Sequence, residues 1–324
     1  MEFSSPPRIP RQLWLLPWAS DHYPAELAQI QKRFPDDLLT SPSFYKETPK
    51  TVGDEYSPGT YIDEWGCIFE NRQKGIIGEV KEPLLKDWRE LDKVRVPRER
   101  LSLSLEKVDE FCRSHDQFVL SRSCGRPFEQ LQFIRKPENF YLDLVDQPPE
   151  LFRLIERVHH FYCEETELWA QTEVDALVFS DDWGGQNSLL ISPSLWRKIF
   201  KPLYIDYVNI AHRRGKYIFM HSDGYIRDII PDLVEIGVDA LNSQLFCMDI
   251  EELGRRFKGR MTFWGEIDRQ YLLPFGTTEE VRAAVKKVKD SLYRDGGVIA
   301  QCEFGVGAKP ENVAAVFSAW EELG

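Results

Sequence analysis

The sequence predicts a (β/α)8 barrel, the TIM-barrel fold, with an N-terminal cap segment. Short β-branched or aromatic runs alternate with helical periods, most of these runs end in polar residues, and no G-x-G-x-x-G or Walker loop occurs. Repeated strand and helix units imply a parallel sheet with right-handed crossovers, and their number favours a closed barrel over an open sheet. A length of 324 residues is normal for one such barrel.

Residues 1–100 and 101–324 differ in composition. The first region is rich in Pro, Gly and aromatic residues, and it contains a hairpin-like segment over 61–70 and an amphipathic stretch over 84–91. We expect residues 1–100 to form a cap that is packed on the barrel and continuous with it, and residues 101–324 to form the barrel. The strands expected in the barrel region begin at Phe118, Ala176, Lys216, Ala240, Met261 and Val298.

The charge and composition exclude several classes of partner. A net charge of −12 and a pI near 5.1 argue against a nucleic-acid or anionic-membrane surface, because such partners are attracted by clustered Lys and Arg. The sequence shows neither a spanning apolar run nor a signal peptide, and its six cysteines lack CxxC spacing. We therefore expect a cytoplasmic protein without a disulfide framework that acts on a small molecule.

Polar side chains follow five of the expected strands at the point where each strand ends. His221 and Asp223 are two residues apart and so lie on the same side of the pleat. Because the carboxyl ends of barrel strands meet at one mouth, side chains that bind metals or transfer protons should converge there. The polar residues at these strand ends are Asp181, Asp182, Gln186, His221, Asp223, Asn242, Gln244, Glu266, Asp268, Gln301, Cys302 and Glu303.

Each of these residues also has a structural interpretation. His221 can be a packed histidine, and the adjacent acids Asp181 and Asp182 can cap the next helix, although two acids before a Gly-Gly loop favour a catalytic role. Trp183 and Trp264 can belong to the core or line a substrate pocket. We place Asp181, Asp182 and Glu266 among the catalytic candidates.

The C-terminal half of the chain, from about residue 176, resembles the uroporphyrinogen decarboxylase superfamily. The resemblance rests on the segments 182–185, 221–224, 265–268 and 309–313, which occur in the family's order with plausible spacing. This superfamily consists of (β/α)8 barrels and includes the decarboxylases and the zinc-dependent methyltransferases that act on methanol, methylamines, methoxylated aromatics and corrinoid proteins. The resemblance implies the barrel fold and an activity of one of these two kinds.

The resemblance also implies a set of metal ligands. The methyltransferases resemble one another in a His-x-Cys pair and a distant Cys, which together bind zinc. In this chain His221 matches the histidine, and Asp223 stands in place of the first Cys. Cys302 lies near the position of the last ligand. Counting back from Pro310 by the family's spacing places the last ligand at Glu303. Cys302 is the match only if this chain carries one inserted residue. Because a thiolate is the softer ligand, we predict that Cys302 faces the metal. Further ligands, or groups that orient His221, are Gln244 and Glu266.

The implied activity is a zinc-dependent methyl transfer. Zinc held by His221, Asp223 and Cys302 would deprotonate a thiol or hydroxyl, or polarise a methoxy oxygen, while the methyl group passes to or from a corrinoid protein docked over the mouth. The decarboxylases share an arginine-bearing N-terminal motif that this chain lacks, and its strand-end loops offer only Arg122 and Arg269. We therefore expect a small, largely apolar or aromatic substrate in a pocket lined by Arg122, Trp183, Asn242, Gln244 and Trp264.

Two alternatives remain open at this point. One is metal-free decarboxylation of a porphyrinogen or a small carboxylated compound, in which Asp182 would stabilise a protonated pyrrole. The other is a barrel that binds a ligand without catalysis.

Overall fold

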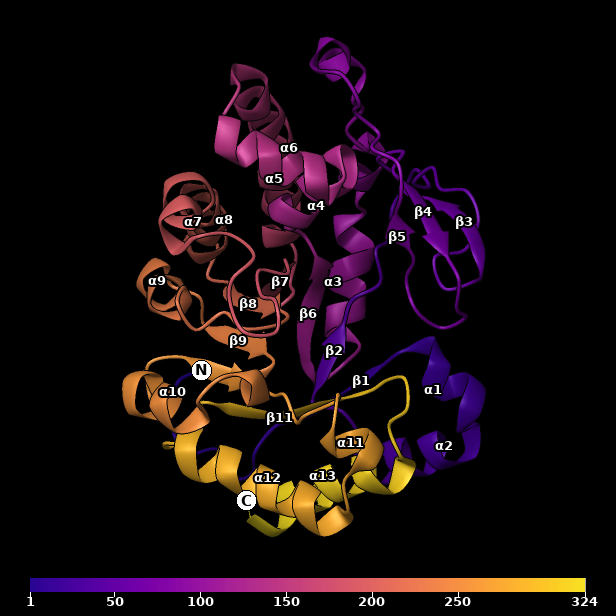
Figure 1. Cartoon of the computed structure of the whole chain (residues 1–324). Helices are drawn as coiled ribbons and strands as arrows, with labels where there is room; N and C mark the ends of the chain where they lie inside the picture. Colours follow the sequence, from indigo (N-terminus) through magenta and orange to yellow (C-terminus); the bar gives the residue numbers. More distant parts are fainter. Residues whose placement is uncertain (324) are drawn as a thin grey trace.

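The computed structural model describes residues 1–323 and confirms a TIM barrel (Figure 1). Its eight parallel strands are hydrogen-bonded in the order β1-β11-β10-β9-β8-β7-β6-β2, so that β1 and β2 stand at the two ends of the sheet and nearly close the barrel. The strands are β1 (Arg11–Leu15), β2 (Leu38–Thr40), β6 (Phe118–Ser123), β7 (Ala176–Ser180), β8 (Tyr217–Ser222), β9 (Ala240–Ser243), β10 (Thr262–Trp264) and β11 (Val298–Phe304).

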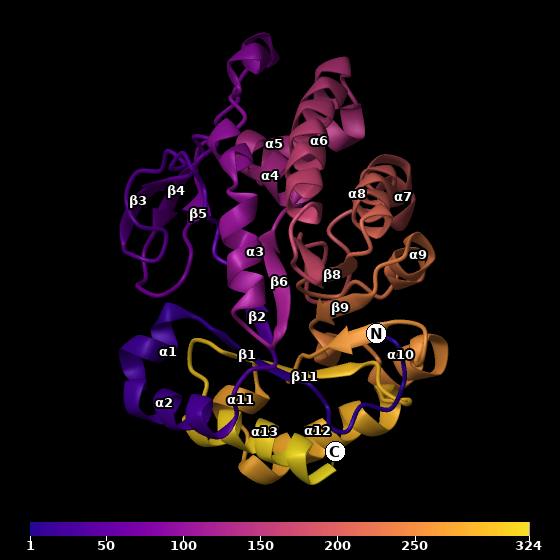
Figure 2. The ribbon, with the colours of Figure 1, turned by 180° about the vertical axis from the view of Figure 1, so that it is seen from behind.

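Helices follow the barrel strands and lie outside them, as Figures 1 and 2 show from opposite sides. Within residues 1–323, none of these helices combines the length and the apolar character that crossing a membrane requires. The helices are α1 (Pro17–His22), α2 (Pro24–Arg33), α3 (Leu105–Arg113), α4 (Pro127–Arg135), α5 (Pro137–Asp146), α6 (Pro149–Ala170), α7 (Pro193–Ile199), α8 (Lys201–Arg213), α9 (Ile230–Ile236), α10 (Ile250–Phe257), α11 (Leu272–Phe275), α12 (Thr278–Leu292) and α13 (Pro310–Leu323), with the short 3-10 helix η3 (Leu245–Cys247) before α10.

The six strands expected after residue 100 are all present, but the barrel does not begin there. Strands β1 and β2 precede residue 100 and belong to the eight-stranded sheet. The boundary between a cap over 1–100 and a barrel over 101–324 is therefore wrong. These two strands were missed because β2 has only three residues and β1 is a short run between prolines that carries no strong alternation.

The segment between β2 and α3 adds no strand to the eight-stranded sheet and packs against α4 and α6. It contains a three-stranded antiparallel sheet, which includes the hairpin expected over 61–70, and two short 3-10 helices. The amphipathic stretch over 84–91 is irregular until η1 begins. The elements of this segment are β3 (Gly59–Ile62), β4 (Ile68–Asn71), β5 (Glu79–Val80), η1 (Trp88–Lys93) and η2 (Arg98–Ser102).

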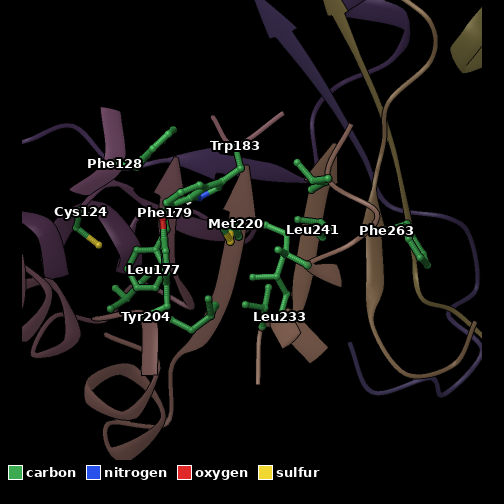
Figure 3. Close-up of a cluster of buried hydrophobic side chains, with 14 of the residues drawn as sticks. Cys124, Phe128, Leu177, Phe179, Trp183, Tyr204, Met220, Leu233, Leu241 and Phe263 are labelled. Carbon is green, nitrogen blue, oxygen red and sulfur yellow. Dashed lines mark hydrogen bonds between the residues drawn. The ribbon is translucent and has the colours of Figure 1, made fainter. Parts of the chain in front are cut away.

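Alternation along the strands divides the core into two parts. The barrel interior is filled by Leu38, Leu120, Ala176, Phe219, Ala240, Trp264 and Ile299. Residues of the opposite parity point outward and pack against the surrounding helices, and Figure 3 shows this for Leu177, Phe179, Met220 and Leu241 together with Trp183 and Tyr204. The side of the strand on which a residue lies therefore decides whether its side chain reaches the barrel axis or the helices.

A buried ion pair joins the segment between β2 and α3 to helix α6. Arg100 on η2 donates to both oxygens of Glu165 on α6, at 2.7 and 2.8 Å, and to Glu64 at 2.8 Å. The Glu165 side chain is only 1% exposed. Burial raises the pKa of Glu165, and the charge of Arg100 opposes that shift.

We expect Arg100→Met to destabilise the protein by about 3–5 kcal/mol, because it leaves Glu165 buried without its counter-ion. Urea unfolding at neutral pH measures the loss. The control is Arg89→Met, whose pair with Asp87 is exposed and should contribute little to stability. Equal losses in the two variants would contradict the structural role of Arg100.

Candidate metal centre

His221 lies at the end of β8 and is oriented by a hydrogen bond to Asn242 on β9. The His221 Nδ1 is 2.6 Å from the Asn242 Oδ1. The Asn242 Nδ2 donates to the carbonyl of Trp264 and to Gln301 Oε1, so its Oδ1 must accept from a protonated Nδ1. His221 therefore presents the lone pair of Nε2 to the barrel mouth, as a metal-binding histidine does.

Two carboxylates face this nitrogen. The Nε2 of His221 is 3.6 Å from Asp182 Oδ1 and 3.6 Å from Asp223 Oδ1. One donor atom from each of the three residues lies within 4.8 Å of the other two. An imidazole nitrogen and two carboxylate oxygens at such separations form a donor set that fits a divalent metal ion.

Close contact between the loops after β7 and β8 brings Asp182 to Asp223. The amide of Asp223 donates to Asp182 Oδ1 at 2.8 Å, and the amide of Gly184 donates to the Asp223 carbonyl at 3.0 Å. A Cβ atom on Gly184 would lie only 2.4 Å from the Tyr225 nitrogen, so a glycine is required for this approach. The Gly-Gly sequence after Asp182 thus has a structural cause.

The two oxygens of Asp223 have different surroundings. Its Oδ2 accepts from the guanidinium of Arg269, whereas its Oδ1, within residues 1–323, is buried and accepts no hydrogen bond. A buried carboxylate oxygen without a donor is costly unless a cation completes its contacts. This oxygen also faces His221 Nε2, and it is the observation that best supports a metal between the two side chains.

Arg269 also binds two further acids at the mouth. Its Nη1 donates to Glu303 Oε2 at 2.9 Å, and its Nε lies 3.4 Å from Glu266 Oε1. Burial raises the pKa of Glu303 and that of Glu266, the latter well above its usual range, and the charge of Arg269 opposes both shifts. Three carboxylates therefore share one guanidinium beside the candidate metal centre.

Comparison with known proteins identifies the family. A family model described as uroporphyrinogen decarboxylase (URO-D) matches residues 62–323, which is most of the chain. The chain belongs to this family. No curated protein matches it in a sequence comparison.

Solved structures extend this result at the level of the fold. A methyltransferase from Methanosarcina mazei aligns with a TM-score of 0.61 and 16% identity over 80% of this chain and 76% of that chain. An endo-beta-1,4-xylanase from Gloeophyllum trabeum aligns with a TM-score of 0.45 and 11% identity over 98% of each chain. At such low identity the first likeness is a likeness of fold.

The structure does not bring Cys302 to the metal centre. Along β11, Ile299 points into the barrel and Gln301 contacts Asn242, whereas Cys302 packs with Phe304 in the core between barrel and helices. The residue of β11 that faces the mouth beside Asp223 is Glu303. The prediction that Cys302 rather than Glu303 faces the metal is therefore wrong, because adjacent residues of a strand point to opposite sides.

Asp181 also lies outside the group formed by His221, Asp182 and Asp223. Its carboxylate accepts from the amides of Phe128 and Glu129 at 2.8 Å each, and from the Tyr204 hydroxyl at 2.6 Å. It therefore caps the first turn of α4, and burial raises its pKa well above the usual range. The expected catalytic role of Asp181 is replaced by a structural one, whereas Asp182 reaches the mouth.

The predicted substrate pocket is only partly assembled. Trp183 is fully buried among aromatic side chains of α4, α7 and α8, and Trp264 is buried in the barrel interior, so neither lines an open pocket. Asn242 is buried beneath His221, and Arg122 is exposed. Gln244 alone borders a cavity beside the metal centre, where it accepts from the Gly224 amide at 3.1 Å.

That cavity lies between the loops that follow β9 and β10. Its volume is about 40 Å³, and it is bordered by Gln244, Cys247, Glu266, Arg269 and Tyr271, among others. A volume of roughly 10–15 Å³ already accommodates one water molecule. Within residues 1–323, the Oε2 of Glu266 is a further buried oxygen without a hydrogen bond. The cavity is lined by both polar and apolar side chains, and its size suits a small group.

Two neighbours of the metal centre were not assigned to it from the sequence. Trp14 on β1 places its ring 5.1 Å from that of His221, and its position depends on a strand that was missed. Glu129 on α4 pairs with Arg126 at 2.9 Å; burial is the main cause of its raised pKa, and the charge of Asp182 adds to that shift. The sequence signal that could have pointed to Glu129 is its i,i+3 spacing from Arg126, which is typical of an ion pair on a helix.

We expect Asn242→Ala to weaken metal binding roughly 10–100-fold, because His221 loses the acceptor that fixes its tautomer and ring direction. Titration of metal-free protein with Zn²⁺ measures the change. The matched control is Cys302→Ala, which removes a buried thiol from β11 and should leave the affinity unchanged. A large loss of affinity in the control alone would return Cys302 to the ligand set.

Proposed function

We propose that the protein is a divalent-metal-dependent methyltransferase that moves a methyl group between a small methylated or methoxylated compound and a corrinoid protein or thiol. The observation that carries the proposal is the pair of carboxylates facing His221 Nε2, one of which has a buried oxygen without a donor. The family and the fold likeness to a protein named methyltransferase support it.

The residues that would hold the metal are His221, Asp182 and Asp223. Zinc is the metal we propose, because it accepts imidazole nitrogen and carboxylate oxygen in sites with three protein ligands. A zinc ion bound there would lower the pKa of a thiol or hydroxyl, or polarise a methoxy oxygen. Asn242 orients His221, and Arg269 holds the second oxygen of Asp223.

The charges at the mouth disfavour a substrate with many carboxylates. Arg269 already binds Asp223 and Glu303, and Arg126 already binds Glu129. A porphyrinogen would bring further carboxylates to this acidic mouth, and each one buried without a partner costs roughly several kcal/mol. A decarboxylase of such a substrate would need cationic side chains that are not already paired.

A corrinoid protein is the partner we propose for the second half of the reaction. Exposed apolar side chains occur on the segments that follow β10 and β11, including α11: Tyr271 is 63% exposed, Phe275 78% and Val306 43%. Such side chains favour contact with another macromolecule. Docking there would bring a carried cofactor to the strand ends where the metal ligands lie.

We expect the purified protein to bind about one divalent metal ion per chain. His221→Ala should weaken this binding by roughly 100-fold or more, because it removes a ligand itself, which costs more than removing a residue that only orients a ligand. Metal analysis of protein prepared without chelator gives the stoichiometry, and circular dichroism verifies that the variant is folded. Full metal occupancy in folded His221→Ala protein would exclude the proposed centre.

We expect methyl transfer from small methylated or methoxylated compounds to a reduced corrinoid, and no significant decarboxylation of uroporphyrinogen. Loss of the transfer on metal removal, with recovery on adding Zn²⁺, would tie the activity to the centre. Rapid formation of coproporphyrinogen would instead make the protein a decarboxylase. Binding of methylated compounds without any turnover would favour the non-catalytic barrel.

A further inference from the structure

Arg269 contacts both a ligand of the proposed metal centre and an acid that could become one. Its Nη2 binds Asp223 Oδ2, its Nη1 binds Glu303 Oε2 at 2.9 Å, and its Nε lies 3.4 Å from Glu266 Oε1. All the polar edges of the guanidinium are thus directed at carboxylates. The arginine side chain is 21% exposed, so these contacts are partly shielded from water.

The contact between Arg269 and Asp223 occupies one carboxylate oxygen of Asp223 and leaves the other free to bind a metal. Oδ1 faces His221 Nε2 at 3.6 Å, while Oδ2 is held by Arg269. A carboxylate held in this way can bind a metal through one oxygen, but it cannot chelate through both without leaving the arginine. Arg269 therefore restricts how Asp223 can coordinate.

Glu303 is an acid beside the metal centre that lies outside the donor group. It lies on the face of β11 that looks into the mouth, is paired in the sheet with Trp14, and is close enough to His221 and Asp223 for their charges to act on its pKa. It is absent from the group of donor atoms that lie within 4.8 Å of one another. Its partner is the guanidinium instead.

We infer that Arg269 keeps the metal centre open: by holding Glu303 and the second oxygen of Asp223, it limits the protein to three ligands and leaves coordination positions for substrate. This inference rests on the proposed metal centre. Arg269 is in this sense a positioning residue, since it acts on the centre through Asp223 and Glu303. Open positions are what separates catalytic from structural metal sites.

The local structure explains why an arginine stands at this position. The fork of donors reaches two carboxylates at once, which a lysine ammonium on a flexible stem does not do in a fixed geometry. Asp268 fixes the backbone that follows, because its Oδ1 accepts from the amides of Gln270 and Tyr271 at 2.9 Å each. The direction of Arg269 is thus set by the loop that carries it.

The test compares Arg269→Met with wild type by titration of the metal-free proteins with Co²⁺. We expect binding about tenfold tighter in the variant, because Glu303 and the second oxygen of Asp223 become free to coordinate and ligand charge increases affinity. The visible Co²⁺ spectrum should change with the ligand set. Binding of 2-mercaptoethanol to the Co²⁺ form, seen as a thiolate charge-transfer band, should weaken by about tenfold or more because the open positions are filled.

Two further variants separate this effect from others. Adding Glu303→Gln to Arg269→Met should restore most of the thiol binding, since the amide does not replace the carboxylate as a ligand. Arg227→Met, which breaks an ion pair with Glu252 away from the centre, should behave as wild type. If Arg269→Met fails to fold, a structure of the wild type with bound Zn²⁺ provides the test. We expect Arg269 to remain hydrogen-bonded to Glu303 in that structure. Coordination of the metal by Glu303 would overturn the inference.

The outcomes distinguish this inference from the proposed function. If the wild type binds no metal, the proposed centre fails, and this inference with it. If the wild type binds metal and Arg269→Met binds it more weakly, Arg269 only supports the geometry of Asp223 and the inference is overturned. Tighter binding with an unchanged Co²⁺ spectrum and unchanged thiol binding would also overturn it, because that result reflects charge alone.

Discussion

The hydrogen bonds of the Asn242 side chain are the constraint on which the rest of the site depends. This one amide joins four consecutive strands: it accepts from His221 on β8, lies on β9 itself, and donates to the Trp264 carbonyl on β10 and to Gln301 on β11. Each atom of the amide is used, so its orientation is fixed. The tautomer of His221 follows from it, and so does the direction of the nitrogen that faces the two carboxylates.

Electrostatics then decides which ligands the mouth can accept. The acids Asp182, Asp223, Glu266, Glu303 and Glu129 outnumber the arginines that bind them, Arg269 and Arg126. Such an excess of negative charge attracts a metal cation and repels an anionic substrate. Burial is the main cause of the raised pKa of Glu266 and Glu303; the charge of Asp223 adds to the shift, and that of Arg269 opposes it.

Much of the barrel was predictable from the sequence, and the failures have physical causes. Six strands were recognised because each is a β-branched or aromatic run that ends in polar residues. Strand β2 was missed because its three residues make no pattern, and their role depends on pairing with β6, which is distant in sequence. The burial of Trp183 was undetermined for a similar reason, since it depends on the packing of α4 and α8 around it.

The ligand assignment shows how sensitive a site is to the register of one strand. His221 and Asp223 were correctly expected to lie together, because they share one strand end. The choice between Cys302 and Glu303 required knowing which alternate residues of β11 point to the barrel mouth. That orientation follows from the hydrogen bonds of β11 with β1 and β10, and two adjacent polar residues do not reveal it. Asp182 was named as catalytic, and its place beside His221 arises from the contact of two loops.

In the proposed centre, Asp223 stands where the resemblance to the methyltransferases would place a thiolate, and this difference has a structural consequence. A thiolate presents one sulfur atom, whereas the carboxylate of Asp223 presents two oxygens that can bind together or separately. A single-oxygen geometry therefore needs a second partner for the other oxygen, and Arg269 supplies it. Arg269 in turn requires a loop that aims it and an acid that completes its contacts, which are provided by Asp268 and Glu303. Asp223 and the groups around Arg269 consequently form one unit, and substituting cysteine at position 223 alone would leave Arg269 with only Glu303 and Glu266 of its three carboxylates.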